Sequence, residues 1–275
     1  MKTTTKLVSV MFVALLSTPA LAGKGGSAGL IQQAVSSGST DAIIAEVEKT
    51  EGLMCEDCVQ MVTNLLADNR ASVREVAGWW FAKRPALRDA LAEQFEADIT
   101  GSDSVRVRNA ADFLGATRTL TGLASLRTAM SHTGLSTDAK LAIVRATKVL
   151  AHVNGNSILI QGMQDSDASV RAASVLAWRD ILAQKNAQPV VALLGDGDAN
   201  VRAQAAAVVG GMGEASARAQ LEGLLGDNDP FVRRNAAWAL GKLGQAASRA
   251  PLTVAANDKS PIVRGVAQAA LAQLH

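Results

Sequence analysis

The sequence predicts an all-α fold, a right-handed α-solenoid (superhelix) of stacked helical hairpins. The first observation is a phrase of the form Asp-x-x-x-x-Val-Arg that returns every 31 residues, with its aspartates at positions 165, 196, 227 and 258. The second is that apolar residues around each copy have helical spacing, and the third is that Gly and Pro stand where helices end and begin. Self-similarity at such a period is typical of solenoids, in which each unit buries its apolar face against its neighbours.

Residues 1–22 have the pattern of a secretory signal peptide. Lys2 and Lys6 precede a short apolar stretch at 7–16, and Ala20-Leu21-Ala22 supplies a small-x-small cleavage pattern. The stretch is about half of the roughly 20 residues that span a bilayer, so we expect an exported, periplasmic protein that is not membrane-embedded. The chain has 27 basic and 25 acidic residues, and removing two lysines with the signal leaves 25 of each. This neutrality argues against nucleic-acid binding.

After the signal, residues 23–29 are predicted to form a flexible leader and residues 28–54 a pair of N-terminal capping helices, because terminal units must shield the stack. The repeat solenoid is expected over residues 55–275, with about six or seven hairpins. One divergent unit is expected between residues 108 and 165. Its anchor is either Asp138-Ala139-Lys140 or Val144-Arg145.

The best repeat, residues 215–244, illustrates the expected hairpin. Residues 215–225 carry apolar side chains on one helical face. Asp229 is a good N-cap, and Pro230 suits the first turn of a second helix over 230–243. Gly244 ends that helix.

At positions 227–241 the sequence DNDPFVRRNAAWALG matches the pattern D-x-D-x-x-V-R-x-x-A-A-x-A-L-G. With this motif the chain resembles the HEAT-repeat family, in particular the short HEAT-like units first described in phycobilisome lyases, over residues 55–275. The resemblance implies a ladder of hydrogen bonds between the repeated Asp and Arg of adjacent hairpins. An Arg directly after a core Val also needs acidic or carbonyl partners; a basic binding stripe is the alternative. The predicted ladder residues are Asp68, Arg74, Arg108, Asp165, Arg171, Asp196, Arg202, Asp227, Arg233, Asp258 and Arg264.

The two cysteines of the chain, Cys55 and Cys58, form a Cys-x-x-Cys pair at the expected start of a helix. An inert disulfide suits an oxidising compartment, and an inert pair of buried thiols is also open, because Cβ atoms three residues apart on a regular helix are farther apart than a bridge allows. Redox exchange is a second reading, because a helix N-terminus lowers a thiol pKa, although the two intervening carboxylates oppose this. Copper(I) binding is a third, because Met54 and Met61 add two soft sulfur ligands.

The seventh position of each second helix, counted from the ladder Val, is expected to face the concave surface. Large aromatic residues there are candidate anchors for a partner, because such residues are enriched among interface hot spots. The alternative is that the rings only fill gaps between repeats. Trp178, at the ninth position, is expected in the core. The candidate binding residues are Trp79, Phe113, Arg234, Asn235, Trp238 and Lys242.

Catalytic patterns are missing from the sequence. HEAT-repeat hydroxylases similar to deoxyhypusine hydroxylase carry His-Glu pairs that hold iron, and this chain has no His-Glu dipeptide. We therefore expect a non-catalytic, monomeric scaffold or assembly factor that binds a protein partner, without a cofactor or metal. The alternative function is a thiol-redox or copper(I)-handling accessory protein, and a third, from the resemblance, is a lyase-like chaperone for cofactor attachment.

Overall fold

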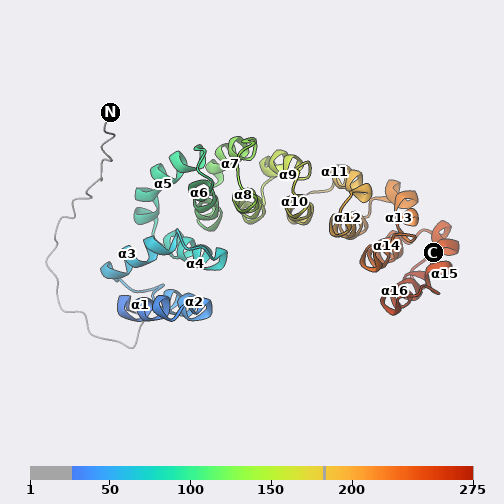
Figure 1. The fold of residues 1–275 in the computed structure, drawn as a ribbon, viewed down its shortest axis with the longest axis horizontal. Coiled ribbons are helices and arrows are strands. Elements are labelled where there is room, and N and C mark those ends of the chain that lie inside the picture. Colours follow the sequence, from blue (N-terminus) through green and yellow to red (C-terminus); the bar gives the residue numbers. More distant parts are fainter. Residues whose placement is uncertain (1–26, 182–183, 275) are drawn as a thin grey trace.

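The computed structural model describes residues 27–181 and 184–274, and all regular secondary structure in these residues is helical. The helices pair into hairpins that stack into an arch, so the predicted solenoid is confirmed (Figure 1). The first helices of the hairpins line the convex side of the arch. They are α3 (Glu56–Leu65), α5 (Pro85–Ile99), α7 (Leu123–Met130), α9 (Asn156–Gly162), α11 (Gln188–Val191), α13 (Arg218–Leu224) and α15 (Arg249–Ala255).

The second helices line the concave side of the arch and pack directly against one another (Figure 1). They are α4 (Ala71–Ala82), α6 (Ser104–Ala116), α8 (Thr137–Leu150), α10 (Ala168–Asp180), α12 (Ala199–Gly211), α14 (Pro230–Leu243) and α16 (Pro261–Leu271). Short 3-10 turns precede or extend several first helices, at Leu120–Gly122, Val153–Gly155, Ala192–Gly195, Ala215–Ala217 and Ala246–Ser248.

At the N-terminal end, α1 (Ala28–Ser37) and α2 (Thr40–Glu48) pack against α3 and α4 and cover this end of the stack. The expected signal peptide, and residues 23–26 of the expected leader, lie outside the described residues. The leader prediction was wrong at its end, because Ala28 and Gly29 belong to α1 and Ser27 caps that helix by accepting the N–H of Leu30.

Small residues let the second helices approach closely. A Cβ added at Gly241 of α14 would lie 2.8 Å from the Cα of Ala270 in α16, and one added at Gly115 of α6 would lie 2.8 Å from the Cα of Ala146 in α8. Interiors are close-packed, so such positions leave no room for another carbon atom. The buried apolar side chains form one continuous core through the stack.

In the best repeat, the second helix begins and ends at the residues that the sequence predicts. The Asp229 side chain accepts the N–H groups of Phe231 and Val232, α14 begins at Pro230, and Gly244 ends it with φ 66°. The first helix is shorter than the expected 215–225, because its start is a 3-10 turn and α13 ends at Leu224. Trp178 lies in the core as expected, 2% exposed, and its Nε1 donates to the carbonyl of Asn186.

Candidate functional site

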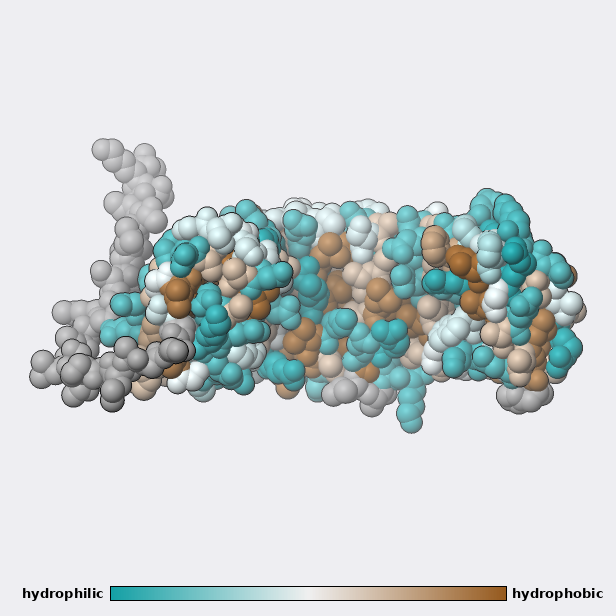
Figure 2. Space-filling model, turned by 90° about the horizontal axis from the view of Figure 1, so that it is seen from below, coloured by the Kyte–Doolittle hydropathy of each residue, from teal (hydrophilic) through white to brown (hydrophobic). Residues whose placement is uncertain are grey.

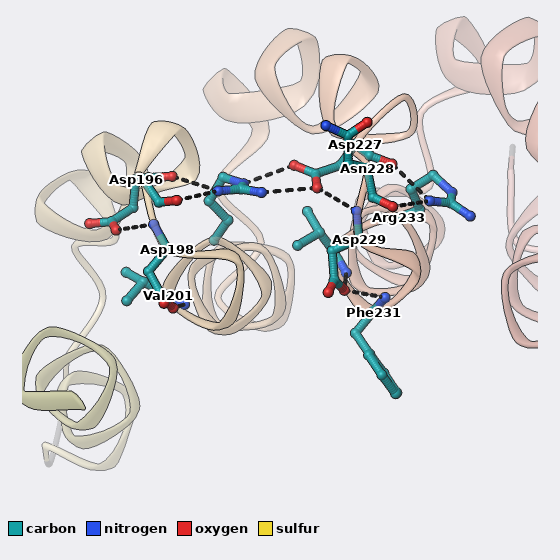
Figure 3. A network of polar contacts seen from close by, with 11 residues as sticks. Asp196, Asp198, Val201, Asp227, Asn228, Asp229, Phe231 and Arg233 are labelled. Carbon is teal, nitrogen blue, oxygen red and sulfur yellow. Dashed lines mark hydrogen bonds and ion pairs between the residues drawn. The ribbon is translucent and has the colours of Figure 1, made fainter. Parts of the chain in front are cut away.

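The two aspartates of the D-x-D motif have different roles at the edge of the stack (Figure 3). The second, such as Asp229, caps a second helix. The first lies two residues earlier and binds both its own loop and the preceding repeat. Asp227 accepts from Nε and Nη2 of Arg202 at 2.8 and 3.0 Å, and from the N–H of Asp229 at 2.9 Å. Arg202 also donates through Nη1 to the carbonyls of Asp196 and Gly197. One arginine thus joins two adjacent loops.

The same contacts recur in the neighbouring repeats. Arg171 binds Asp196, and Arg233 binds Asp258, each by two hydrogen bonds of 2.8–2.9 Å. The arginine hydrogen bonds hold the pKa values of Asp196, Asp227 and Asp258 below the usual range, against the opposing effect of burial. Because these guanidinium groups are occupied by carboxylates and carbonyls, they act as structural links and not as a basic binding stripe.

The ladder is incomplete towards the N-terminal half. Position 134, two residues before the cap Ser136 of α8, is Gly, and position 101, two residues before the cap Asp103 of α6, is also Gly. Ladder carboxylates are therefore absent from both loops. The anchor of the divergent unit is Lys140, whose Nζ binds Asp165 at 2.6 Å in place of the usual arginine.

Four predicted ladder residues do not make the ladder contact between repeats: Arg74, whose carboxylate partner is Asp112 of α6, and Asp68, Arg108 and Arg264. Asp68 binds Arg70 in its own loop, because it lies in the first hairpin that carries the motif. Arg108 binds the side chain of its neighbour Asn109, and no carboxylate lies within ion-pair distance of it in the described part of the chain. Among the described residues, Arg264 donates only to the carbonyls of its own loop, Asp258 and Lys259.

The position of Arg108 follows from a shift of one residue in α6. From the cap to the core Val there are four residue steps in α6, Asp103 to Val107, but three in α14, Asp229 to Val232. Counted from the caps, Arg108 is therefore equivalent to Arg234, which binds its neighbour Asn235 in the same way.

This shift also makes the prediction for Phe113 wrong. The Phe113 ring is 1% exposed and stacks on Phe95 with a centroid distance of 4.2 Å, so it belongs to the core. The concave position that Trp238 holds in α14 is held in α6 by Asp112. In α8 it is held by Arg145, nine residues after the cap.

Asp112 joins three second helices. Arg74 of α4, which has no ladder Asp to bind, donates through Nε to Oδ2 of Asp112 at 2.8 Å. Arg145 of α8 donates to both carboxylate oxygens at 3.1–3.2 Å from the other side. Arg108 is buried beside this pair of contacts, and burial together with the charge of Arg74 lowers its pKa.

A cleft of about 350 Å³ opens on the concave side over this group, and it is called the central cleft below. Asp112, Gly115 and Ala116 of α6 line its floor, between Trp79 of α4 and Arg145 of α8. Small residues on the middle helix, flanked by large ones, create the hollow. The other lining residues are Ala71, Glu75, Arg118, Ala146, Lys148 and Val149.

The two predicted tryptophan anchors have matching surroundings. Trp79 is half-buried in α4 and Lys83 lies over its ring, 5.6 Å from the centroid. Trp238 is 38% exposed in α14 and Lys242 lies over its ring at 5.7 Å. A smaller hollow of about 140 Å³ lies beside Trp238, towards α16.

Of the polar residues predicted around Trp238, one has a structural role. Asn235 donates from Nδ2 to the carbonyl of Ala203 at 2.7 Å, which joins α14 to α12. Arg234 lies over Phe231 and remains half-buried at the surface. Seen from the concave side, apolar patches alternate with polar ones over the visible part of the face (Figure 2).

The cysteine pair lies at the start of α3, in the first hairpin of the repeat solenoid. The sulfur atoms are within bonding distance, 2.00 Å apart, with the Cα atoms 5.2 Å apart. Cys58 is fully buried and Cys55 is half-buried, with its Sγ accepting the N–H of Cys58 at 3.2 Å. An apolar cleft of about 540 Å³ adjoins Cys55. Its lining includes Leu53, Met54, Val59, Arg84 and Leu87.

The structure gives no support to a copper set of Met54, Cys55, Cys58 and Met61. Met54 is fully exposed, Met61 packs against the core, and the two cysteine sulfurs lie against each other. Within residues 27–181 and 184–274 no group of three or more His, Cys, Asp or Glu side chains could hold a metal ion. None of the helices described there is long and apolar enough to cross a membrane.

Comparison with known proteins agrees with this architecture. Residues 187–272, which span α11 to α16, match the family model for HEAT repeats, so the predicted resemblance is confirmed. No curated protein sequence matches the chain. The solved structure of Escherichia coli YibA superposes with TM-score 0.55 at 16% identity, over 93% of this chain and 99% of that one.

Two further solved structures have the same fold. An engineered protein gives TM-score 0.52 at 17% identity, over 88% of this chain and 77% of that one. Cex1p gives TM-score 0.52 at 14% identity, over 84% of this chain and 56% of that one. At these identities the likeness concerns the fold alone.

Proposed function

We propose that this HEAT-repeat solenoid is a non-catalytic scaffold or assembly factor that binds a protein partner along its concave face. The observation that carries the proposal is the pair Trp79 and Trp238. They occupy the same position of α4 and α14, remain accessible near opposite ends of the concave row, and each lies under a lysine cation. Half-exposed tryptophan with a cation over its ring is suited to burial against a partner.

The helices between the two tryptophans favour a long contact. The equivalent positions of α10 and α12 hold Leu176 and Ala207, both half-buried, so a partner chain can approach the backbone there. Packed helices lie about 8–10 Å apart, and five steps separate α4 from α14, so the two rings are about 40–50 Å apart along the face. An extended segment of about 12–15 residues spans this distance at roughly 3.3 Å per residue.

The test is partner recovery after crosslinking in cells that make the native protein. Trp79→Ala and Trp238→Ala should each reduce recovery of the crosslinked partner, because both remove an anchor, and helical content by circular dichroism should not change. Val254→Ala is the matched control, since Val254 is an exposed apolar residue of α15 on the convex side. Equal recovery from the tryptophan variants and the control would exclude concave binding.

Export to the periplasm is part of the proposal and is supported by the signal pattern of residues 1–22. Cell fractionation with N-terminal sequencing of the purified protein tests it. We expect a periplasmic protein that begins at Gly23, and an uncleaved cytoplasmic chain would contradict this.

A second candidate function, thiol–disulfide exchange, is favoured by the asymmetry of the cysteine pair. Cys55 is half-buried and lines the apolar cleft, whereas Cys58 is fully buried. A partner thiolate would attack Cys55 Sγ, the Cys55–Cys58 bond would break, and Cys58 would leave as a thiolate, which gives a mixed disulfide through Cys55. A second partner thiol would then release the reduced pair and an oxidised partner.

Mass spectrometry distinguishes this exchange from an inert disulfide. The oxidised protein is incubated with a dithiol peptide that has apolar residues, and reduction of the Cys55–Cys58 pair is followed. In a separate reaction the Cys58→Ala variant, whose Cys55 is a free thiol, is incubated with the disulfide form of the same peptide. The Cys55 thiolate attacks that disulfide, one peptide sulfur leaves as a thiolate, and the mixed disulfide, which Cys58 can no longer resolve, is trapped by acid quenching. Exchange predicts an adduct on Cys55 that becomes weaker when Leu87→Ala removes part of the cleft wall. A pair that stays oxidised in excess peptide would exclude the exchange.

A further inference from the structure

We infer that the central cleft binds a carboxylate side chain of the partner segment, with an apolar neighbour of that side chain against Trp79. The inference rests on the concave binding proposed above and names the chemistry that the middle of the face recognises. Its basis is the combination of a hollow floor, cations without carboxylate partners and an aromatic wall.

The positive charge of the cleft follows from the incomplete ladder. In complete repeats each guanidinium has a carboxylate from the next loop, but positions 101 and 134 are Gly. Asp112 alone therefore serves Arg74 and Arg145, and Arg108 is buried without a carboxylate within ion-pair distance among the described residues. Three guanidinium groups thus surround one carboxylate.

Two arginines of the lining are available to a ligand. The Arg145 side chain is 43% exposed, and its Nη1 group has no acceptor among the described residues. Arg118 follows α6 with a positive φ of 54°, an uncommon conformation for a residue other than glycine, and is exposed at the rim of the cleft. Its guanidinium has no partner in the part of the chain that the structure describes.

The remaining lining residues specify what accompanies the carboxylate. Trp79 and the exposed side chain of Val149 provide apolar walls. Lys148 is held by Asp180 at 3.2 Å, and Glu75 of α4 places one negative charge on the wall opposite α8. The cationic side is therefore at Arg118 and Arg145, and arginine is well suited to grip a carboxylate with two hydrogen bonds.

The experiment uses the full mature chain labelled with 5-fluorotryptophan, and Trp79→Phe assigns the Trp79 resonance by 19F NMR. The probe is an acetylated and amidated peptide of alternating Leu and Glu, and the control peptide has Gln in place of each Glu. We expect the Glu peptide to shift the Trp79 resonance saturably, with at least tenfold higher affinity than the Gln peptide. Arg118→Gln and Arg145→Gln should each weaken binding about tenfold, and Glu75→Gln should strengthen it.

Arg127→Gln is the matched control, because Arg127 is an exposed arginine of α7 on the convex side. The inference is overturned if the Trp79 resonance does not move, if both peptides bind equally, or if Arg127→Gln weakens binding as much as Arg118→Gln. It is also overturned if sodium acetate alone reproduces the shift at the same affinity, since the site would then take any small carboxylate.

Failure of the inference and failure of the proposed function give different results. If partner recovery depends on Trp79 and Trp238 but not on Arg118 and Arg145, concave binding is retained and the carboxylate site is excluded. If the Glu peptide binds as predicted but no partner is crosslinked through the tryptophans, the carboxylate site is retained and the scaffold function is excluded.

Discussion

The ladder arginines should couple neighbouring repeats, and Arg233 and Arg264 provide a matched pair to test this. Both follow a core Val in consecutive second helices, α14 and α16, and both donate to the carbonyls of their own loop. Only Arg233 also binds a carboxylate of the next repeat, Asp258. Substituting Met at each position keeps the apolar stem and removes the guanidinium, so the difference between the variants reports the link between repeats.

The structure sets the expected size of this difference. The Arg233 and Asp258 side chains are 5% and 12% exposed, so Arg233→Met leaves a largely buried carboxylate that keeps only the Ser260 N–H as a partner. Removing one partner of such a pair costs about 3 kcal/mol, at the lower end for buried pairs because Asp258 lies near solvent. Arg264→Met loses only hydrogen bonds to carbonyls, about 1 kcal/mol.

Hydrogen exchange read by mass spectrometry measures the effect locally. In a solenoid the terminal repeat is held by its interface with its neighbour, so Arg233→Met should loosen α15 and α16 first. About 3 kcal/mol corresponds to roughly 100-fold faster exchange there, against about fivefold in Arg264→Met. Equal effects of the two substitutions, or unchanged protection of α15 and α16 in Arg233→Met, would refute the coupling role of the ladder.

Three further predictions concern stability. The pKa values of Asp196, Asp227 and Asp258 are lower in the folded chain than the usual 3.8, so their contribution is complete above 3.8 and is lost as pH falls further. The urea midpoint of unfolding should therefore decrease as the pH is lowered below about 4, and Asp258→Asn should make this decrease smaller. An unchanged pH dependence of the midpoint in the variant would count against the ladder contribution. Gly241→Ala should destabilise by about 1–3 kcal/mol through its contact with Ala270, whereas Gly265→Ala, with no atom within 4 Å, should stabilise by about 0.5–1 kcal/mol; thermal unfolding separates them, and equal melting shifts would contradict the close packing. Asp112→Asn should reduce the free energy of unfolding by about 3 kcal/mol, because it leaves three adjacent guanidinium groups without a full counter-charge; an unchanged urea midpoint would contradict this.

The fold could be predicted because several repeats carry the same local sequence signals independently of one another. The 31-residue period holds over four copies, an Asp caps α10, α12 and α14, and a Pro begins α14 and α16. α14 begins and ends at the predicted residues. Local signals of this kind depend on few neighbours. The D-x-D motif was informative in a further respect, since its two aspartates separate into a ladder residue and a cap.

The candidate site was harder to predict because it depends on an irregular repeat. Counting from Val107 placed Phe113 on the concave face, whereas the capping residue and the small-residue motif place Asp112 there. The stretch Ala110-Ala111-Asp112-Phe113-Leu114-Gly115 aligns with Ala236-Ala237-Trp238-Ala239-Leu240-Gly241 and carried this signal. The redirection of Arg74 to Asp112 needed the folded structure, because it joins helices from different repeats.

The most direct test of concave binding is photo-crosslinking from single positions in cells. A photoreactive amino acid replaces Ala207 on the concave side of α12, and in a matched variant it replaces the exposed Gln220 of α13 on the convex side. Concave binding predicts one dominant crosslinked partner from position 207, reduced by Trp238→Ala, and none from position 220. Partner capture that is equal from both positions, or stronger from position 220, would contradict it.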